Sequence, residues 1–328
     1  ELAFIQDRRK LMVMNLDTKK VRQITDGSYW PSTGGGFEYQ WSPDGKWFAL
    51  CFTGNKHDPY YDIGIVSVQG GEITNLTNSG YSSGSPTWAM DGNAILFTSE
   101  RYGMRNHASW GSMEDVFLCF VNQDAYDKYR LSKEDYELLK EVEKEQEKLK
   151  KGDKKEDAKK DDKKDEKSSK DIVVELDGIQ DRIVRLTPNS SSLGSAIIDK
   201  KGETLYYTAS FEGGMDLWKL NLRKKDVKLA NKGVGYASFE MSKDGKNIFL
   251  LGGRMQKMDA ASGKLTPITY HANLEMDLVA EREAMFNHVY KQQQKRFYNL
   301  NMHGVDWDAM TEAYRKFLPH ISNNYDYA

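Results

Sequence analysis

A turn motif that recurs along the chain constrains its fold more than any other feature of the sequence. In each copy an apolar, strand-like segment leads into a tight turn containing glycine, and a second apolar segment follows. Three of the four copies contain Asp-Gly, a pair whose tolerance of positive φ suits the turn of a β-hairpin. The copies lie at residues 41–46, 88–93, 198–203 and 241–246.

A second sequence marker, a threonine at the end of a short strand-like segment, recurs along the chain together with the turn motif. Short strand-like segments end in Ile-Thr or Leu-Thr at residues 24–25, 76–77, 186–187 and 268–269. One unit therefore reads as four strands within about 40–50 residues, which is the period of a β-propeller blade. An antiparallel sandwich also contains many short strands, but it has no reason to repeat both markers. We predict a mainly β fold, a β-propeller with four-stranded blades, over residues 1–272.

The number of units predicts an incomplete propeller of four full blades and one partial blade. Residues 1–25 supply only three strands of a unit, and propellers normally close into rings, so we expect further blades before Glu1. The alternative is that residues 270–276 fold back, supply the missing strand and close a five-bladed ring. The full units cover roughly residues 37–78, 80–187, 190–231 and 234–269.

The second full unit is longer than the others because it carries an insertion at about 124–172. Its first part has helical spacing, with Ser132 as the expected N-cap ahead of Glu134 and Asp135. Between residues 140 and 170, 24 of 31 residues are charged. Such a segment cannot bury enough apolar area to offset its ordering entropy. We therefore expect a frayed helix that leads into a flexible loop, in preference to a docking tail.

The periodicity becomes helical in the last part of the chain, residues 273–328. One helix is predicted from about Leu278, and a second from Trp307 to Pro319, with Asp306 as its N-cap. Two such helices cannot bury their own apolar faces, so we expect them either to begin a helical domain or to pack on the propeller. The predicted apolar faces are Phe286, Val289, Tyr290, Gln293 and Phe297 in the first helix, and Met310, Ala313, Tyr314 and Phe317 in the second.

Motifs that carry chemistry are absent from the sequence. It contains no Gly-x-Ser-x-Gly nucleophile elbow and no His-Glu-x-x-His zinc helix, and the glycines at 34–36 lack the Lys of a P-loop. Asp44, Asp91 and Asp244 are assigned to hairpin turns, because three different blades cannot bring them together. His303 and Asp306 could pair as a base and its orienting group, but helix capping is the preferred role. The six histidines, at 57, 107, 271, 288, 303 and 320, are too scattered to suggest a ligand set.

Composition excludes several further classes. The formal net charge of −2 argues against a nucleic-acid binder. No apolar run approaches the ~18 residues that a membrane-spanning helix requires. Cys51 and Cys119 are too few for a disulfide framework or a four-cysteine zinc site, and we expect both to be buried free thiols. The prediction is therefore that this chain holds no catalytic, cofactor-binding or metal-binding residues.

The segment 297–307, Phe-Tyr-Asn-Leu-Asn-Met-His-Gly-Val-Asp-Trp, resembles the start of the protease core in tricorn and tricorn-like serine proteases, and the resemblance extends to Pro319. Residues 176–187 resemble blades of the same proteins. The resemblance implies the second propeller and the first core helices of such a protease. It places the catalytic His, the nucleophilic Ser and a PDZ domain outside this chain, so His303 is not assigned a catalytic role.

The same resemblance implies a function for the propeller. It would admit unfolded peptides or oligopeptides to a site built by the missing domains, in a protein that is a homo-oligomer at full length. This chain alone would be inactive. A cytoplasmic location is implied, while a periplasmic one stays open because the chain does not begin with Met. The alternatives are a non-catalytic TolB-like propeller that binds protein partners and a prolyl-oligopeptidase-type hydrolase, which would need a nucleophile elbow downstream.

Overall fold

The computed structural model describes residues 1–28, 38–54, 60–104, 112–153, 171–211 and 213–328. The expectations for the glycines at 34–36, for His57 and His107, and for the charged stretch 154–170 lie outside these residues. The chain forms two compact units, Glu1–Ile268 and Thr269–Ala328.

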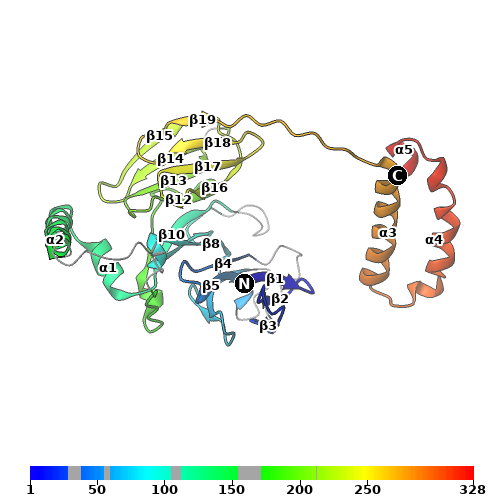
Figure 1. Ribbon diagram of the computed structural model, residues 1–328, viewed down its shortest axis with the longest axis horizontal. Helices are drawn as coiled ribbons and strands as arrows, with labels where there is room; N and C mark the ends of the chain where they lie inside the picture. Colours follow the sequence, from blue (N-terminus) through cyan, green and yellow to red (C-terminus); the bar gives the residue numbers. More distant parts are fainter. Residues whose placement is uncertain (29–37, 55–59, 105–111, 154–170, 212) are drawn as a thin grey trace. The chain divides into compact units, whose positions relative to one another are not determined.

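In the described part of unit 1, the strands form five antiparallel sheets, each built from consecutive strands (Figure 1). The first sheet has three strands, β1 (Leu2–Gln6), β2 (Lys10–Met14) and β3 (Val21–Gln23). Each of the other four has four strands, as the repeat predicted. These are β4 (Tyr39–Trp41), β5 (Trp47–Phe52), β6 (Asp62–Ser67) and β7 (Thr74–Asn75); β8 (Ser83–Ala89), β9 (Ala94–Ser99), β10 (Asp115–Phe120) and β11 (Ile183–Arg185); β12 (Ser192–Ile198), β13 (Thr204–Ser210), β14 (Asp216–Asn221) and β15 (Asp226–Asn231); β16 (Ala237–Met241), β17 (Asn247–Gly252), β18 (Gln256–Asp259) and β19 (Leu265–Pro267).

The core of unit 1 lies between neighbouring sheets. Leu11 and Val13 of the first sheet pack with Phe48 and Leu50 of the second, and similar apolar clusters join each later pair of sheets. The first strands of neighbouring sheets also lie together, β4 beside β8 and β12 beside β16. Face-to-face stacking with the first strands on one side is the arrangement of propeller blades, and the predicted fold class is confirmed.

The Asp-Gly turns are built as the sequence predicted. Gly45 and Gly245 adopt φ of 72° and 71°, values that suit glycine. In the matching turns, Asp44 accepts hydrogen bonds from Ser42 Oγ (2.5 Å) and the Lys46 N–H (3.1 Å), and Asp244 repeats both bonds with Ser242 and Lys246. These carboxylates therefore stabilise turns, as expected.

The Thr marker has a structural cause that the sequence alone did not reveal. Thr25, Thr77 and Thr187 each lie just beyond the outermost strand of a blade. Their side-chain oxygens accept the N–H of the second residue of the neighbouring strand, from Leu11, Ile63 and Val116 respectively. In two blades the same hydroxyl also donates to an aspartate, Asp62 or Asp115. The threonine thus fastens the outermost strand of a blade to its neighbour.

The partial blade is a three-stranded sheet in which β1 pairs with β2. Residues 270–276, the alternative source of a fourth strand, form neither helix nor strand. The five-bladed ring closed by that segment is therefore not observed. Tyr39 of the next blade donates its hydroxyl to the Ala3 carbonyl at 3.1 Å, so one polar group of β1 is satisfied from the neighbouring sheet.

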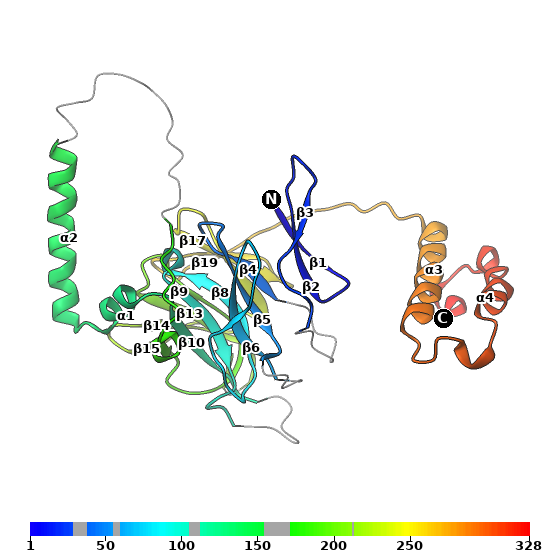
Figure 2. The ribbon, with the colours of Figure 1, turned by 90° about the horizontal axis from the view of Figure 1, so that it is seen from below.

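The insertion between β10 and β11 begins with two helices, α1 (Gln123–Arg130) and α2 (Lys133–Asp153), instead of the single frayed helix that we expected (Figure 2). Ser132 caps α2 as predicted, accepting the Asp135 N–H at 3.1 Å. Tyr136 is buried, and Lys140 forms an ion pair with Glu203. The first turns of α2 therefore pack against the blades, and the contact reaches Lys140, the first residue of the stretch whose charge density suggested a solvated segment.

Unit 2 contains α3 (Leu278–Arg296), α4 (Trp307–Arg315) and α5 (Asn324–Tyr327). Asp306 caps α4 as expected, accepting the Ala309 N–H at 2.9 Å. The predicted apolar face of α4, formed by Met310, Ala313, Tyr314 and Phe317, is exposed, in line with the expectation that these helices cannot bury their own apolar faces, while Thr311 is buried. The helix also stops at Arg315, before Pro319, which lies in a short 3-10 turn.

Candidate functional site

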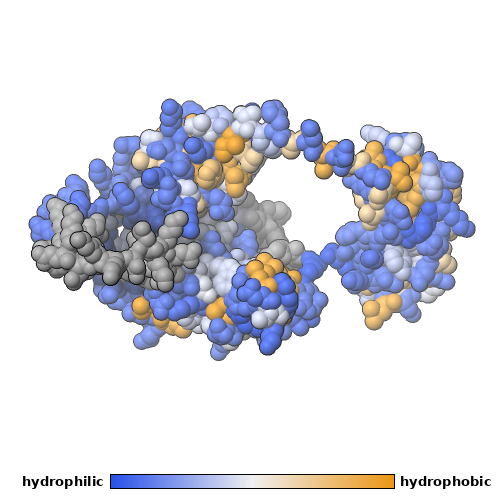
Figure 3. All heavy atoms as spheres, viewed as in Figure 1, coloured by the Kyte–Doolittle hydropathy of each residue, from blue (hydrophilic) through white to orange (hydrophobic). Residues whose placement is uncertain are grey.

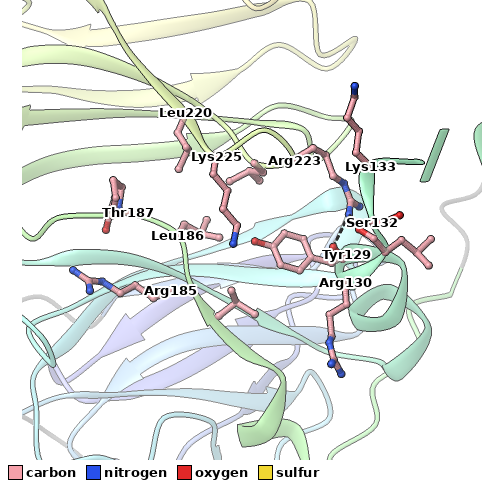
Figure 4. Close-up of a pocket in the computed structure, with 14 residues that line it drawn as sticks. Tyr129, Arg130, Ser132, Lys133, Arg185, Leu186, Thr187, Leu220, Arg223 and Lys225 are labelled. Atoms are coloured by element: carbon pink, nitrogen blue, oxygen red, sulfur yellow. Dashed lines mark hydrogen bonds between the residues drawn. The ribbon is translucent and has the colours of Figure 1, made fainter. Parts of the chain in front are cut away.

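A basic cleft in unit 1 has a volume of about 540 Å³ (Figure 4). Three segments far apart in sequence build it: the corner between α1 and α2, the end of β11 with the residues after it, and the hairpin between β14 and β15. Its lining consists of Tyr129, Arg130, Leu131, Ser132, Lys133, Val184, Arg185, Leu186, Thr187, Pro188, Leu220, Leu222, Arg223 and Lys225.

The floor of the cleft is apolar. Leu186, Leu220 and Leu222 are buried members of the hydrophobic cluster that joins the second and third full blades, and Val184 packs against it. Tyr129 adds an aromatic wall, tilted against Phe120 with ring centroids 5.0 Å apart. The cleft thus opens directly onto the core between two blades.

Arg223 fixes the α1–α2 corner that forms one wall of the cleft. Its guanidinium donates to the backbone carbonyls of Tyr129 (2.5 Å), Leu131 (3.1 Å) and Lys128 (2.9 Å) at the end of α1. It also lies 3.9 Å from the centroid of the Tyr136 ring. A cation at a helix C-terminus satisfies carbonyls that have no partner within the helix.

The remaining cations give the cleft its positive character. The Arg185 guanidinium already has protein partners, because it forms an ion pair with buried Asp115 at 2.8 Å and also contacts Ser190. Lys225 lies in the hairpin turn with φ of 51°, and its ammonium extends into the cleft near Tyr129 (Figure 4). The lining contains five Arg or Lys residues and no Asp or Glu. Burial raises the pKa of the Tyr129 phenol, and the nearby Arg223 opposes that shift.

Sequence reasoning missed this cleft. The only signal was a local excess of basic residues in two places, at 128–133 and 223–225. Their separation in sequence gave no reason to place them together, and basic turns are usually solvated.

Asp44, Asp91 and Asp244 belong to the turns of three different blades, as expected. Asp44 has a second contact, because it also accepts the Ile172 N–H at 2.9 Å and so ties the returning end of the insertion to the first full blade. Burial acts to raise the pKa of Asp44, but hydrogen bonds from Ser42, Ile172 and Lys46 outweigh it, and the pKa is lowered. Within the described residues, no three His, Cys, Asp or Glu side chains could together hold a metal ion.

The two cysteines are free thiols. Cys119 is fully buried as expected, and burial raises its pKa to about 12. The Cys51 residue is only half-buried, although we expected it to be buried. Desolvation nevertheless raises the pKa of its thiol as well. Its sulfur lies 3.4 Å from the Ser83 carbonyl. Neither environment favours a reactive thiolate.

His303 and Asp306 form separate interactions in unit 2. The His303 ring contacts the Tyr298 hydroxyl and, at 3.4 Å, the Asn299 side-chain amide, while Asp306 caps α4. Asn299, Tyr298 and His303 thus order the turn between α3 and α4. Its backbone is unusual, with φ of 51° at Met302 and 55° at His303.

The helices of unit 2 leave an apolar groove of about 160 Å³ between α3 and α4. Tyr290 and Trp307 stack at its centre, and the Trp307 indole N–H donates to the Tyr290 carbonyl at 3.3 Å. Several apolar residues of unit 2 are more than half exposed, including Val289, Tyr314 and Phe317, and the apolar surface is visible in Figure 3. Buried Arg282 donates to the carbonyls of Ile321 and Ser322, which fastens the last turn to α3.

Comparisons with known proteins agree with this architecture. Residues 278–328 match the family model of the Tricorn protease C1 domain. A crystal structure of the tricorn protease has the same fold, with a TM-score of 0.64 at 12% identity, and the match covers 98% of this chain and 30% of that chain.

Two curated proteins match over short stretches. The uncharacterized peptidase YuxL of Bacillus subtilis is 37% identical over 59 residues, 18% of this chain and 9% of its own length. An uncharacterized protein of Agrobacterium fabrum is 34% identical over 83 residues, 22% of this chain and 27% of its own length. The chain therefore spans less than a third of each of these relatives.

The chain thus combines stacked propeller blades with a C-terminal helical segment, residues 278–328, that is similar to the C1 domain of tricorn protease. Both the family model and the structural match agree with the resemblance to tricorn-like proteases that the segment 297–307 indicated. Among the described residues, none of the helices combines the length and the apolar character that crossing a bilayer requires.

Proposed function

We propose that this chain is the substrate-access propeller and the first core helices of a tricorn-like serine protease that degrades peptides. The observation that carries the proposal is the order of the two units, a propeller of stacked four-stranded blades followed directly by a segment that matches the C1 domain. The C1 match argues against the alternative, a free-standing TolB-like propeller that only binds partners, because such a module has no need of a protease-core segment.

The propeller would select substrates by their size. The second, third and fourth sheets are held by buried apolar clusters on both faces, so these blades form a rigid wall that a folded protein cannot deform. An extended peptide, which presents only the width of its backbone and side chains, would pass to a site contributed by domains outside this sequence. PDZ and catalytic domains, homo-oligomeric assembly and a cytoplasmic location belong to this proposal through the family resemblance.

The described residues also support inactivity of this chain alone. Proteolysis by a serine enzyme needs a nucleophile beside a base, and the partners of His303 are Tyr298 and Asn299. Incubation of the 328-residue chain with unfolded peptides, followed by mass spectrometry, should give no cleavage. Turnover that copurifies with the chain and is lost in the variant His303→Ala would refute this part of the proposal.

The access role is tested in the natural full-length protein. Ser192 and Ser238 are exposed on β12 and β16, which are first strands of their blades. Tryptophan at both positions should slow cleavage of a long unfolded peptide more than cleavage of a tetrapeptide. Lys228→Trp on the outer strand β15 is the matched control and should change neither rate. Equal slowing of both substrates, or no slowing, would contradict an access role.

A further inference from the structure

We propose that the basic cleft binds a carboxylate carried on a short apolar chain, as at the C-terminus of a hydrophobic peptide or the head of a fatty acid. Its volume of about 540 Å³ falls within the range of roughly 300–1,000 Å³ that small-molecule sites usually have. The proposal is independent of the proposed function, because it rests only on residues of unit 1 and requires no peptidase activity.

The apolar floor indicates what the body of the ligand is made of. Leu186, Leu220 and Leu222 are buried against the core between two blades. A ligand that lies on it must gain free energy by removing apolar surface from water, at about 25 cal/mol per Å². A purely inorganic anion would gain nothing from this surface.

The charge of the lining indicates the head group. With five cationic residues and no carboxylate in the lining, the cleft favours an anion over a neutral or cationic ligand. Arg223 is already occupied by the backbone carbonyls of the α1–α2 corner, and Arg185 is shared with Asp115. Arg223 and Arg185 therefore shape the walls of the cleft and contribute to its positive electrostatic potential, but their guanidinium groups already have protein partners.

Lys225 is the cation placed to meet the head group. Its side chain extends between Tyr129 and Leu186 (Figure 4), so its ammonium reaches the space above the apolar floor. Among the described residues it makes no ion pair, whereas nearby Lys228 is paired with Asp226. One ammonium above an apolar surface matches one carboxylate on an apolar chain. A phosphate would need several converging donors.

The flanking segments hold these groups in place before any ligand arrives. Thr187 is fixed by its hydrogen bond to Asp115, and the α1–α2 corner by Arg223. The buried carboxylate of Asp115 is neutralised by Arg185 and so does not repel an anion. A preformed site of this kind loses little conformational entropy when it binds.

The test is calorimetric titration of the whole 328-residue chain with four probes. These are N-acetyl-Leu-Phe with a free carboxylate, the same dipeptide as its C-terminal amide, octanoate, and inorganic phosphate. We expect the free acid to bind about tenfold more tightly than the amide, because only the acid makes the charged contact. Binding by octanoate but not by the peptide acid would identify a fatty acid as the source of the carboxylate, and the reverse would identify a peptide terminus.

Matched variants separate this site from general surface charge. Lys225→Gln should weaken binding of the acid about tenfold, and Lys225→Arg should retain most of it, since the charge is kept. Lys224→Gln removes the neighbouring charge, which is exposed and outside the lining, and should leave binding unchanged. Equal affinity for acid and amide, an unchanged affinity in Lys225→Gln, tighter binding of phosphate than of the acid, or no binding at millimolar concentration would each overturn the proposal.

Discussion

Thr187 and Asp115 are 72 residues apart in sequence, yet the Thr187 hydroxyl donates a hydrogen bond to the Asp115 carboxylate at 2.8 Å in the buried interior. The same hydroxyl accepts the Val116 N–H at 3.2 Å. This pair of bonds joins the outermost strand of the blade to β10 on the far side of the insertion. The two bonds hold β11 in register with β10, although an insertion of more than sixty residues separates these strands.

Removal of this hydroxyl should destabilise unit 1. In Thr187→Val the shape is kept, but the buried Asp115 carboxylate loses a donor and the Val116 N–H loses its acceptor. Unsatisfied buried groups of this kind cost about 1–3 kcal/mol each, so the urea midpoint should fall. Thr187→Ser keeps the hydroxyl and should stay close to the original protein. Equal midpoints for the Val and Ser variants would show that the hydrogen bonds contribute little.

Arg223 should govern how firmly the insertion is held. Arg223→Gln loses the bonds to the α1 carbonyls and the contact with the Tyr136 ring. Amide hydrogen exchange in α1 and the first turns of α2 should speed up about tenfold, while strands β12–β15 keep their protection. Lys224→Gln is the matched control and should leave both regions unchanged. Faster exchange throughout the blades would indicate global destabilisation and contradict a local clamp.

The thiols should be inert in the folded chain. With a pKa raised to about 12, Cys119 is thiolate in only about one molecule in 10,000 at pH 8. An aromatic disulfide reagent should therefore label neither cysteine quickly at pH 8, and two thiols should react at once in guanidinium. Cys51, which is only half-buried, should be the first to react when the protein is partly destabilised. Fast native labelling of Cys119 would contradict its buried placement.

The turn at Asp44 should make stability depend on pH. The folded pKa of Asp44 is lowered, so its contribution is present above the unfolded pKa of about 3.9 and is lost as pH falls through the folded pKa. The difference in urea midpoint between the original chain and Asp44→Asn should therefore be larger at pH 7 than at pH 3. Asp44→Asn should also speed exchange of the Ile172 N–H, which Asp44 accepts at 2.9 Å.

Asp244→Asn is the control for this experiment. Asp244 accepts the same two turn bonds, but it is exposed and makes no contact equivalent to Ile172. Its replacement should leave exchange of the Ile172 N–H unchanged. A difference between Asp44→Asn and the original chain that does not vary with pH would contradict the assignment.

Several local features were determined by the sequence alone, because they depend on residues close together in the chain. The positive φ of Gly45 and Gly245 follows from the Asp-Gly turns, and the caps of Ser132 and Asp306 follow from short polar side chains ahead of helical segments. The repeat of these turns then determined the propeller, since only stacked blades bury so many similar four-stranded sheets.

Tertiary structure decided the features that join distant segments. The sequence marked Thr187 as the end of a strand but did not reveal its bond to Asp115, and it suggested a solvated segment from residue 140 onward, where Lys140 in fact pairs with Glu203. It also gave no sign that Lys225 would meet the corner after Tyr129 in one cleft. Local propensity acts over a few residues, whereas these contacts form only when the sheets stack and bring together groups nearly a hundred residues apart.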